Sequence, residues 1–380
     1  MMRALAREAP DDLSFAARLH ARIAENGPLT IEAFMQACSS DPASRAYASR
    51  QPIGGAGDFI TAPEISQIFG ELIGLWSVSV WQSMGAPRAV TVAELGPGRG
   101  TLMADALRAW RAVPTFVDTV SVALIETSPV MVAAQRSALR EARVPVSWYA
   151  TLDDLPDGPL IVLANEFIDA LPIRQFIYRD GTWLERLIAS DGSGGFCFTE
   201  GNRLKLGDQA GDHLPDSAPD GSILETRPAA QTLMHELARR ASVAPLAVLI
   251  IDYGHDETGF GDTLQAVRGH RFAATLADPG SADLSAHVDF ADLKRLAGAL
   301  GLKPYGPMPQ GEFLLKLGLG ERHDRLLQRA TPAQAEAIAS GASRLVDPKQ
   351  MGILFKALAL TGADLPPPPP FGPQHLTVSY

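Results

Sequence analysis

The stretch Val90-Thr91-Val92-Ala93-Glu94-Leu95-Gly96-Pro97-Gly98-Arg99-Gly100-Thr101 decides the fold expected for this chain. A near-continuous apolar strand, residues 90–95, ends in an acid and runs into three glycines, and residues 101–112 then have the pattern of a helix. Glycines at such a turn let the backbone approach a nucleotide-like ligand, because no side chain blocks the way. The stretch therefore predicts the first unit of a nucleoside-binding sheet.

The same alternation of strand and helix patterns continues after this turn. Near-continuous apolar strands separated by helices are typical of a parallel sheet that helices cover on both faces. We therefore expect an α/β fold with a doubly wound parallel sheet. The predicted strands of this core are residues 90–95, 120–126, 146–149, 160–164, 247–252 and 312–317, and its predicted helices are residues 101–112 and 128–142.

Other segments flank or interrupt this core. Residues 1–88 contain helix patterns and the glycine-rich loop 54–61, and we expect them to form an N-terminal helical cap. Residues 173–245 carry short strand patterns separated by glycine and aspartate turns, which predicts an inserted antiparallel β subdomain. The remaining predicted parts are the core, residues 89–172 and 246–360, and a proline-rich C-terminal tail, residues 361–380.

The flanking segments carry more specific expectations. The insertion contains the aromatic residues Trp183 and Phe196, which we take as candidates for a homodimer interface. A polar stretch, residues 207–221, is expected to be a mobile loop, and residues 366–370 a polyproline spacer. The predicted helices of the cap are residues 13–23, a short one from Thr30 and a long one from Pro63 to about Gly85, and the predicted strands of the insertion are residues 175–178, 183–188 and 196–199.

Composition and charge bound the class of protein. The 380 residues are 46% hydrophobic, which suits a large folded core, and 43 acidic against 33 basic residues give a net charge of −10. This balance argues against a nucleic acid partner, because phosphates are anionic. No apolar run approaches the roughly 20 residues that cross a bilayer, so we expect no membrane span. Two distant cysteines, Cys38 and Cys197, and the lack of a signal pattern indicate a reducing, cytoplasmic setting.

The glycine turn and two nearby acids predict the cofactor class. The spacing is GxGxG, with Thr101 where a dinucleotide fingerprint has its third glycine. Glu94 precedes Gly96 by two residues, and an acid there is usual in methyltransferases, where it helps to hold the cationic end of the cofactor. Glu126 closes the next strand, where a carboxylate can accept hydrogen bonds from two ribose hydroxyls. We therefore favour a methyltransferase over a nicotinamide enzyme; the alternative is a tight strand-to-helix connection without a ligand.

A second polar stretch, Asn165 to Pro172, follows the predicted strand 160–164. Open α/β sheets bind ligands at this end of their strands. We therefore expect polar groups of this stretch to face the sulfonium and the incoming nucleophile. The alternative is that Asn165 caps a short helix and that Glu166 and Asp169 are merely solvated.

Asp252 ends the strongly apolar segment Val248 to Ile251 and is a third candidate acid. The following Tyr253-Gly254-His255 are candidates to line the acceptor pocket. The alternative is that Asp252 only caps a turn. A further polar cluster, Asp283, His287 and Asp289, has a spacing that matches no helical pair of metal ligands, so we predict no metal.

Six longer motifs carry a resemblance to a known family: Gly57 to Glu64, Glu94 to Thr101, Asn165 to Pro172, Ile251 to Gly254, Gly280 to Phe290 and Met351 to Lys356. They resemble the MidA-like methyltransferases, which include a mitochondrial complex I assembly factor that methylates an arginine of a core subunit. The resemblance covers about residues 57–359. It implies a Rossmann-like methyltransferase core, S-adenosyl-L-methionine as the cofactor and a protein substrate that presents arginine.

The resemblance also implies roles for individual residues. The family's Gly-Asp-Phe-x-Thr loop maps onto Gly57 to Thr61 and is expected to close over the cofactor, although this chain has Ala62 where relatives often carry serine. The short N-terminus favours a bacterial, cytoplasmic protein, with the mitochondrial matrix as the location in a eukaryote. The predicted cofactor-binding residues are Gly57, Thr61, Glu64, Glu94, Gly96, Gly98, Gly100, Glu126 and Asn165, and the predicted catalytic residues are Glu166, Asp169 and Asp252.

Methyl transfer is an in-line displacement, so the site must align nucleophile, methyl and leaving group and exclude water. If the nucleophile is a guanidinium of a protein such as a complex I core subunit, carboxylates must orient it and help concentrate the lone pair on one nitrogen. One alternative is a non-enzymatic complex I assembly chaperone with the same fold. The other is a small-molecule methyltransferase, whose acceptor pocket would be enclosed rather than an open groove.

Overall fold

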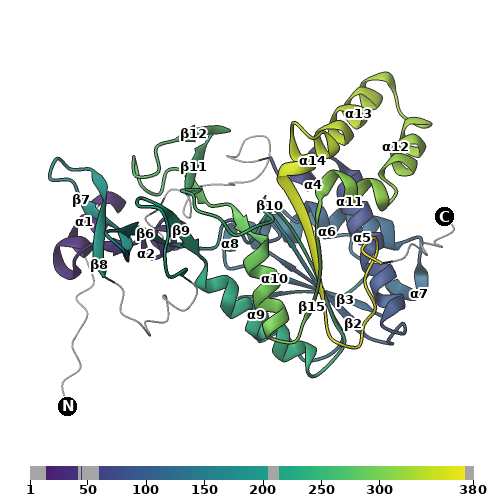
Figure 1. Cartoon of the computed structure of the whole chain (residues 1–380). Coiled ribbons are helices and arrows are strands. Elements are labelled where there is room, and N and C mark those ends of the chain that lie inside the picture. Colours follow the sequence, from purple (N-terminus) through teal and green to yellow (C-terminus); the bar gives the residue numbers. More distant parts are fainter. Residues whose placement is uncertain (1–13, 42–43, 45–59, 204–213, 373–380) are drawn as a thin grey trace, which may run out of the picture. The chain divides into compact units, whose positions relative to one another are not determined.

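The computed structural model describes residues 14–41, 44, 60–203 and 214–372 (Figure 1). The chain divides into two compact units. Unit 1 spans residues 1–52, 172–228 and 259–286, and unit 2 spans residues 53–171, 229–258 and 287–380. This grouping differs from the predicted parts, because the described residues 14–41 cluster with the insertion and not with the helices that follow residue 60. The glycine turn lies in unit 2.

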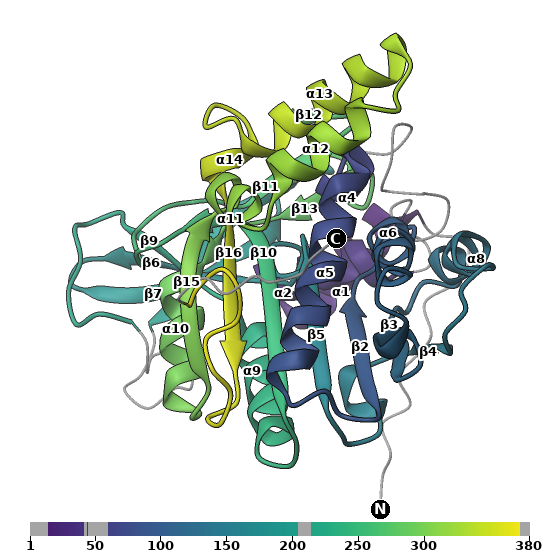
Figure 2. The ribbon, with the colours of Figure 1, turned by 90° about the vertical axis from the view of Figure 1, so that its right-hand side faces the viewer.

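Unit 2 is built on a sheet of eight described strands, in the order β15-β16-β10-β5-β2-β3-β4, with β14 beside β10 (Figure 2). The neighbours from β10 to β4 are parallel, and β16 and β15 add antiparallel strands at one side. The strand order reverses at β2, as the doubly wound prediction requires. The strands are β2 (Val90–Leu95), β3 (Val120–Ile125), β4 (Val146–Tyr149), β5 (Leu160–Asn165), β10 (Leu246–His255), β14 (Val288–Asp289), β15 (Lys303–Pro309) and β16 (Phe355–Thr361).

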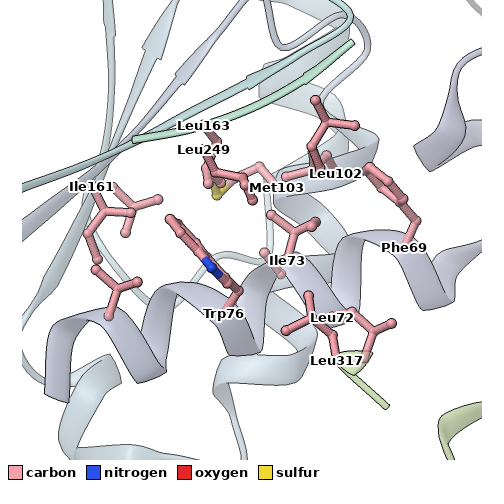
Figure 3. Packing of buried hydrophobic residues seen from close by; sticks show 14 of the residues in the cluster. Phe69, Leu72, Ile73, Trp76, Leu102, Met103, Ile161, Leu163, Leu249 and Leu317 are labelled. Carbon is pink, nitrogen blue, oxygen red and sulfur yellow. The ribbon is translucent and has the colours of Figure 1, made fainter. Parts of the chain in front are cut away.

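Helices cover both faces of this sheet, because successive strand residues point to opposite sides. On one face, α5 (Gln67–Ser83) and α6 (Thr101–Trp110) place Trp76 and Met103 in a cluster with Ile161 and Leu163 of β5 (Figure 3). On the other face, α9 (Pro228–Ala241) and α10 (Phe290–Ala299) supply the apolar side chains that pack with residues such as Val162. The near-continuous apolar strands of the sequence are therefore explained by two buried faces. The remaining helices of this region are α7 (Pro114–Val117) and α8 (Pro129–Ala138).

The single long helix predicted from Pro63 to Gly85 is wrong. The structure has a short α4 (Ala62–Ile65) and then α5, with a break at Ser66, whose φ of −155° and ψ of 128° are extended. The Ser66 hydroxyl accepts a hydrogen bond of 3.3 Å from the Ile68 amide, so this residue caps the second helix. The continuous helical spacing of apolar residues concealed the break.

The strand predicted at residues 312–317 is also wrong, because this segment is the helix α11 (Gln310–Lys316). Phe313 and Leu314 are buried whereas Leu315 is 54% exposed, which is a helical and not an alternating pattern. The sheet instead ends in β15, which contains three prolines. Proline cannot donate a ladder hydrogen bond and is therefore rare in central strands, but it is tolerated in an edge strand such as β15. Among the described strands β15 pairs only with β16, and their register shifts between Tyr305 and Met308.

A helical arm, residues 310–354, joins β15 to β16. It consists of α11, α12 (Leu319–Leu327), α13 (Pro332–Val346) and α14 (Met351–Leu354). Figure 2 shows α13 and α14 at the same end of the sheet as α4. Helix α13 packs closely on α4, since a Cβ added at Gly341 would lie 2.8 Å from the Ile65 carbonyl oxygen. The arm therefore borders the segment that begins at Thr61.

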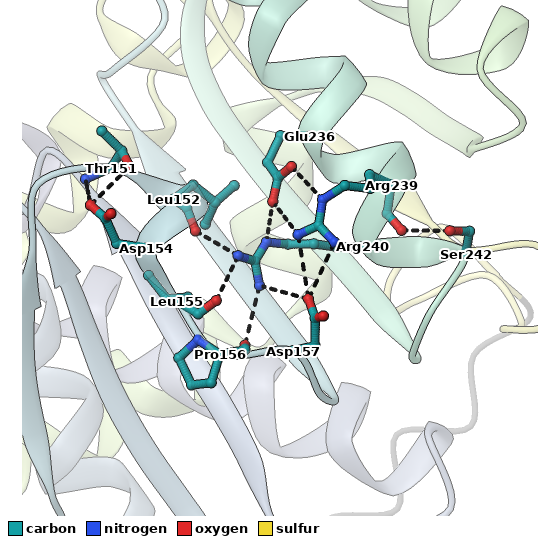
Figure 4. Close-up of polar contacts among 10 residues, drawn as sticks. All are labelled: Thr151, Leu152, Asp154, Leu155, Pro156, Asp157, Glu236, Arg239, Arg240 and Ser242. Atoms are coloured by element: carbon teal, nitrogen blue, oxygen red, sulfur yellow. Dashed lines mark hydrogen bonds and ion pairs between the residues drawn. The ribbon is translucent and has the colours of Figure 1, made fainter.

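A buried arginine fastens α9 to the loop that follows β4 (Figure 4). Arg240 is 3% exposed, and its guanidinium donates to the carbonyl oxygens of Leu152, Leu155 and Pro156 at 2.7, 2.9 and 3.2 Å. Its Nε donates to Glu236 Oε1 at 2.6 Å. The buried charge thus has one carboxylate and three carbonyl partners, so Arg240 is a structural residue.

The segment predicted as a polyproline spacer packs against unit 2. Trp76 Nε1 donates a hydrogen bond of 2.7 Å to the Pro369 carbonyl oxygen, and the rings of Phe371 and Phe313 lie 5.8 Å apart. No described helix is long and apolar enough to cross a membrane.

Unit 1 contains the three antiparallel strands that the sequence predicts, β6 (Arg174–Arg179), β7 (Thr182–Ser190) and β8 (Phe196–Arg203). Their sheet also includes two strands that were not predicted, β1 (Leu29–Thr30) and β9 (Ile223–Thr226). A second small sheet, also not predicted, consists of β11 (Gln265–Arg268), β12 (Arg271–Ala273) and β13 (Asp283–Ser285). Two described helices, α1 (Phe15–Asn26) and α2 (Ile31–Ser40), also belong to the unit, and the side chains of Ser14 and Thr30 cap them. The predicted loop 207–221 lies partly outside the described residues.

The aromatic residues proposed for a homodimer interface are engaged inside unit 1. Trp183 is buried, and its Nε1 donates to the Pro215 carbonyl oxygen at 2.7 Å. Phe196 is half-buried and stacks on His20, with ring centroids 4.2 Å apart. Neither side chain therefore supports the interface that we expected from its sequence position.

Candidate functional site

The glycine turn sits at the carboxyl end of β2, between the two halves of the sheet. Gly96, Gly98 and Gly100 have φ angles of 58°, 53° and 82°, in the region that favours glycine. A Cβ on Gly96 would also lie only 2.8 Å from the Phe167 ring. Gly100 is the N-cap of α6 and supplies no side-chain cap. The turn thus needs glycine for its backbone and leaves α6 amides available to an anionic or polar ligand.

Glu94 lies at the base of this turn as a buried acid. Its side chain is 3% exposed, and Oε2 finds no hydrogen-bond donor among the described residues. Burial raises the pKa of the carboxyl to about 8. An acid without a partner in such a position is costly unless a ligand completes it. A cationic group is the partner that would restore its charged form.

Glu126 follows β3, the neighbour of β2, and so lies one strand away from the turn. The Gly96 amide donates to the Ile125 carbonyl oxygen at 3.1 Å, which joins the two strand ends. Glu126 Oε1 accepts from the Ser128 amide at 2.7 Å, and Oε2 accepts from Gln135 Nε2 at 3.1 Å. Burial raises the pKa of Glu126, and these hydrogen bonds oppose the rise. Since a carboxylate can accept about four hydrogen bonds, acceptor capacity remains for ligand hydroxyls.

A small hollow brings most of the predicted residues together. It measures about 30 Å³, well below the roughly 300–1,000 Å³ of a typical ligand pocket, so the described residues enclose only one end of a nucleoside-sized ligand. Predicted residues that line it are Thr61, Glu64, Glu94, Gly96, Gly98, Asn165 and Glu166. Predicted residues that do not line it are Gly100, Glu126, Asp169 and Asp252. Gly57 lies outside the described residues.

Glu64 and Thr61 reach the hollow from the segment that starts α4. Thr101 Oγ1 donates to Glu64 Oε1 at 2.5 Å, which ties α4 to the first residue of α6. Arg99 Nη1 lies 4.0 Å from Glu64 Oε2. The threonine after the glycine turn therefore has a partner that a glycine would not provide for.

Glu166 has an unusual backbone for a non-glycine residue, with φ of 50°. Its Oε1 accepts from the Ala62 amide at 2.8 Å and from Asn165 Nδ2 at 3.3 Å. Burial raises the pKa of its carboxyl to about 7, and Asp169 adds a smaller rise. The structure therefore holds Glu166 at the strand end through one oxygen, in a strained conformation that is common at functional sites.

Asp252 is fully buried and bonds to backbone. Its Oδ2 accepts from the amides of Ile168 and Asp169 at 2.9 and 3.1 Å, and its Oδ1 accepts from the Tyr253 amide at 2.9 Å. Burial and the neighbouring Asp169 raise its pKa well above the ordinary value. This geometry matches the turn-capping alternative. Asp252 anchors the loop that carries Glu166, and Asp169, also buried, belongs to the same anchored loop.

The segment after Asp252 is closely packed. The Tyr253 ring lies 5.4 Å from both His287 and Phe355, and a Cβ on Gly254 would overlap the Val288 carbonyl oxygen. Asp289 caps α10 by accepting from the Asp292 amide at 2.9 Å. Within the described ranges no three metal-binding side chains come together.

A larger hollow of about 450 Å³ lies elsewhere in unit 2, between α5, α6 and α12. Buried Glu71 occupies its wall and accepts from Arg108 Nε at 3.0 Å and Arg322 Nε at 2.7 Å. Asp105 forms a further ion pair with Arg108. The acidic and basic side chains of this hollow therefore pair with one another. None of the residues that line it lies at the carboxyl end of a parallel strand. We therefore assign the cofactor to the glycine turn, although the hollow there is smaller.

The predicted residues leave out part of this region. Pro63, Pro97, Arg99, Thr101 and Leu102 also line the hollow, and Gln135 lies behind the turn. Gln135 on α8 contacts both the glycine turn and Glu126, through Nε2 bonds of 2.7 Å to Gly98 O and 3.1 Å to Glu126 Oε2. A glutamine in a predicted helix carries no distinguishing motif, so only its proximity in space reveals it.

The residues at the turn fit S-adenosyl-L-methionine. The orphaned Glu94 carboxyl suits its cationic end, the glycine backbone allows close approach, and Glu126 can accept from ribose hydroxyls. The three features belong to one strand end and its neighbour. No metal ligand set competes with this assignment among the described residues.

Comparisons with known proteins agree with this assignment. The chain matches a family model for S-adenosyl-L-methionine-dependent methyltransferases over residues 72–308. It is 36% identical to the mitochondrial protein arginine methyltransferase NDUFAF7 homolog of Drosophila melanogaster, over 91% of this chain and 84% of that protein. It is 34% identical to the mitochondrial protein arginine methyltransferase NDUFAF7 of Homo sapiens, over 89% of this chain and 81% of that protein.

A solved structure shares the fold. A crystal structure from Burkholderia thailandensis bound to S-adenosyl-homocysteine has a TM-score of 0.77 and 25% identity, over 94% of this chain and 95% of that chain. S-adenosyl-homocysteine is what remains of the cofactor after methyl transfer. Together with the glycine turn and its two acids, these matches show that the chain belongs to this family of S-adenosyl-L-methionine-dependent methyltransferases.

Proposed function

We propose that this methyltransferase modifies a guanidinium nitrogen of an arginine on a protein, with a respiratory complex I core subunit as the candidate substrate. Two facts support the proposal. The curated relatives are named protein arginine methyltransferases over most of the chain length. In addition, Glu166 presents a carboxyl at the glycine turn, and carboxylates orient guanidinium groups through paired hydrogen bonds.

The bound cofactor supplies a methyl group on a sulfonium, which is a good leaving group. The residues of the chain must position the acceptor and receive charge. Glu166 uses Oε1 for the Ala62 amide and leaves Oε2 for a guanidinium N–H. When bound, the cofactor would give its methyl group to the guanidinium nitrogen and leave as the neutral thioether, and the methylated nitrogen would release one proton. A carboxyl whose pKa is about 7 can accept that proton near neutral pH.

The observation that carries the proposal is the position of Glu166. It lines the same hollow as Glu94 and the glycines, one residue after the end of β5. The Asp252 carboxylate accepts from the backbone amides of Ile168 and Asp169, two and three residues after Glu166. The loop that carries Glu166 is therefore fixed before an acceptor binds. We assign the catalytic role to Glu166 and a positioning role to Asp252, and Asp169 is a further acid close to both.

The direct test is to incubate the protein with methyl-labelled S-adenosyl-L-methionine and the complex I core subunit from the same organism. Peptide mass measurement then locates any modified residue. Label on an arginine of the subunit supports the proposal. Label only on small molecules would favour the small-molecule alternative, and cofactor binding without any transfer would favour the assembly chaperone.

Glu166→Gln tests the proposed acid. We expect unchanged cofactor affinity and a turnover lower by at least about 100-fold, the usual effect of losing a general base. Glu141→Gln is the matched control, because its side chain is 78% exposed and pairs only with Arg140 at 3.6 Å among the described residues. Wild-type turnover in Glu166→Gln would remove Glu166 from the catalytic role.

The cellular location of the reaction and the oligomeric state of the protein are two further points. We propose that the reaction takes place in the cytoplasm if the chain is bacterial and in the mitochondrial matrix if it is eukaryotic. The relatives carry mitochondrial names, which supports the second setting for them. A homodimer stays a prediction, and light scattering of the purified protein measures it directly.

A further inference from the structure

Gln135 joins three elements of the cofactor site. It lies on α8 and is 0% exposed. Its Nε2 donates to the Gly98 carbonyl oxygen at 2.7 Å and to Glu126 Oε2 at 3.1 Å, and its Oε1 accepts from Trp148 Nε1 at 2.9 Å. The side-chain amide thus connects the glycine turn, the acid after β3 and the strand β4.

The direction of this amide is determined by its partners. An indole N–H can only donate, so the atom that faces Trp148 must be the amide oxygen. The amide nitrogen then faces two acceptors, the Gly98 carbonyl oxygen and the Glu126 carboxylate, and each of its two hydrogens has a partner. A flipped amide would place oxygen against oxygen at both positions. The network therefore has one arrangement.

This arrangement also fixes the Glu126 carboxylate. The Ser128 backbone amide donates a hydrogen bond to Glu126 Oε1, and the Gln135 side-chain amide on α8 donates one to Glu126 Oε2. Helix α8 packs directly against the glycine turn, because a Cβ on Gly100 would lie 3.4 Å from Gln135 Cα. The carboxylate is thus held at a set position relative to the turn before a ligand binds. Fixing a binding group in advance lowers the entropic cost of binding.

We propose that Gln135 is a positioning residue for the cofactor: its buried amide orients the Glu126 carboxylate toward the ribose hydroxyls and so sets the affinity for the nucleoside. The effect passes through Glu126, and Gln135 itself does not contact the reacting atoms. This inference concerns cofactor binding only, so its test does not depend on whether arginine is the acceptor.

Calorimetric titration with S-adenosyl-homocysteine measures the effect without methyl transfer. Gln135→Met keeps the length of the side chain and removes both donors. We expect its dissociation constant to rise about 10- to 100-fold, since hydrogen bonds to charged groups are worth about 1.5–3 kcal/mol. In steady-state kinetics KM for the cofactor should rise while kcat changes little. Gln82→Met, at an exposed glutamine of α5, is the control and should leave both unchanged.

A double-mutant cycle separates positioning from a general structural role. In a Glu126→Ala background, Gln135→Met should weaken binding by less than about threefold, because the group that it positions is gone. A full additional loss in that background, or no loss in the single variant, would overturn the proposal. If Gln135→Met does not fold, Trp148→Phe removes the donor that orients the amide. We then expect a loss of several-fold that also disappears with Glu126→Ala, and a loss that persists would refute the role.

Discussion

Replacing Glu94 with glutamine should make the cofactor-free protein more stable at alkaline pH while it weakens cofactor binding. The carboxyl is buried at the glycine turn, and burial raises its pKa from 4.5 to about 8. A folded-state pKa above the unfolded value means that the folded chain holds the proton more tightly. The resulting stability is fully present below pH 4.5 and is lost as the pH rises through 8.

The size of the effect follows from these two pKa values. Between pH 5 and pH 8 the wild-type protein should lose about 3 kcal/mol of unfolding free energy through Glu94, by proton linkage. Glutamine does not ionise, so Glu94→Gln should lack this loss. Its buried amide costs about 1–3 kcal/mol at any pH if it finds no partner. The difference in unfolding free energy between variant and wild type should therefore change by about 3 kcal/mol in favour of the variant from pH 5 to pH 8.

The cofactor affinity of the wild-type protein should rise with pH, whereas its unfolding free energy falls. A cationic ligand group beside Glu94 favours the ionised carboxylate and so lowers its pKa in the complex. If that pKa falls below 6, the wild-type affinity should rise by up to about 50-fold from pH 6 to pH 8 relative to the variant. The comparison with Glu94→Gln at each pH is necessary, because an α-amino group of the ligand titrates in a similar range.

Two measurements test this reasoning. Urea unfolding of the cofactor-free protein at pH 5 and pH 8 gives the stability difference, and calorimetric titration with S-adenosyl-homocysteine gives the affinity. Glu141→Gln, at an exposed acid, is the control and should follow the wild type in both. A stability difference between wild type and Glu94→Gln that stays constant from pH 5 to pH 8 would refute the raised pKa. An affinity ratio that is independent of pH would refute the role of Glu94 at the cationic end.

The remaining predictions concern four other positions. Gly98→Val should abolish detectable cofactor binding in calorimetry while circular dichroism stays native, because a branched side chain at φ of 53° would be strained and would occupy ligand space. Wild-type turnover should rise with pH around pH 7 as Glu166 ionises, and a Glu166→Gln profile with the same rise would contradict that assignment. Arg240→Met should lower the unfolding free energy by about 3 kcal/mol in urea, since it leaves Glu236 and three carbonyl groups without their buried partner. Gly352→Ala should lower the melting temperature by several degrees, because the added carbon would overlap the Val346 carbonyl oxygen; an unchanged melting temperature would show that α14 adjusts freely.

The parallel part of the sheet could be predicted because its physical signal is local. Strands β2, β3, β5 and β10 are mostly buried on both faces and read as apolar runs, and each is confirmed within a few residues. Strand β4, at the edge of the sheet, is only partly buried and is also confirmed. The antiparallel side of the sheet had no such signal. Prolines obscured β15, and the apolar run at Phe313 to Leu315 looked like a strand although it forms a helix. Strand β16 was not predicted, and only its first two residues, Phe355 and Lys356, belong to the last of the family motifs.

The candidate site shows a similar division. Residues within one continuous motif, such as Glu94 and Gly96, could be placed because a strand end and its turn form one local unit. Contacts between residues that are far apart in the sequence could not be predicted. The bonds from Asp252 to the loop after β5, and from Gln135 to Gly98, connect residues at least 37 positions apart. No sequence pattern distinguishes a capping aspartate from a catalytic one, so the assignment of Asp252 needed coordinates.

The position of β16 has a consequence for biosynthesis. This strand is the last of the described strands to be translated, yet it lies between β10 and β15 in the finished sheet and all seven of its residues are buried. Until it emerges from the ribosome, the nascent chain presents β10 with one hydrogen-bonding edge unfilled along the seven positions from Ala247 to Tyr253. An open apolar edge recruits strands from other molecules. Translational pausing or a premature stop before residue 355 should therefore yield aggregation rather than a shortened, active enzyme.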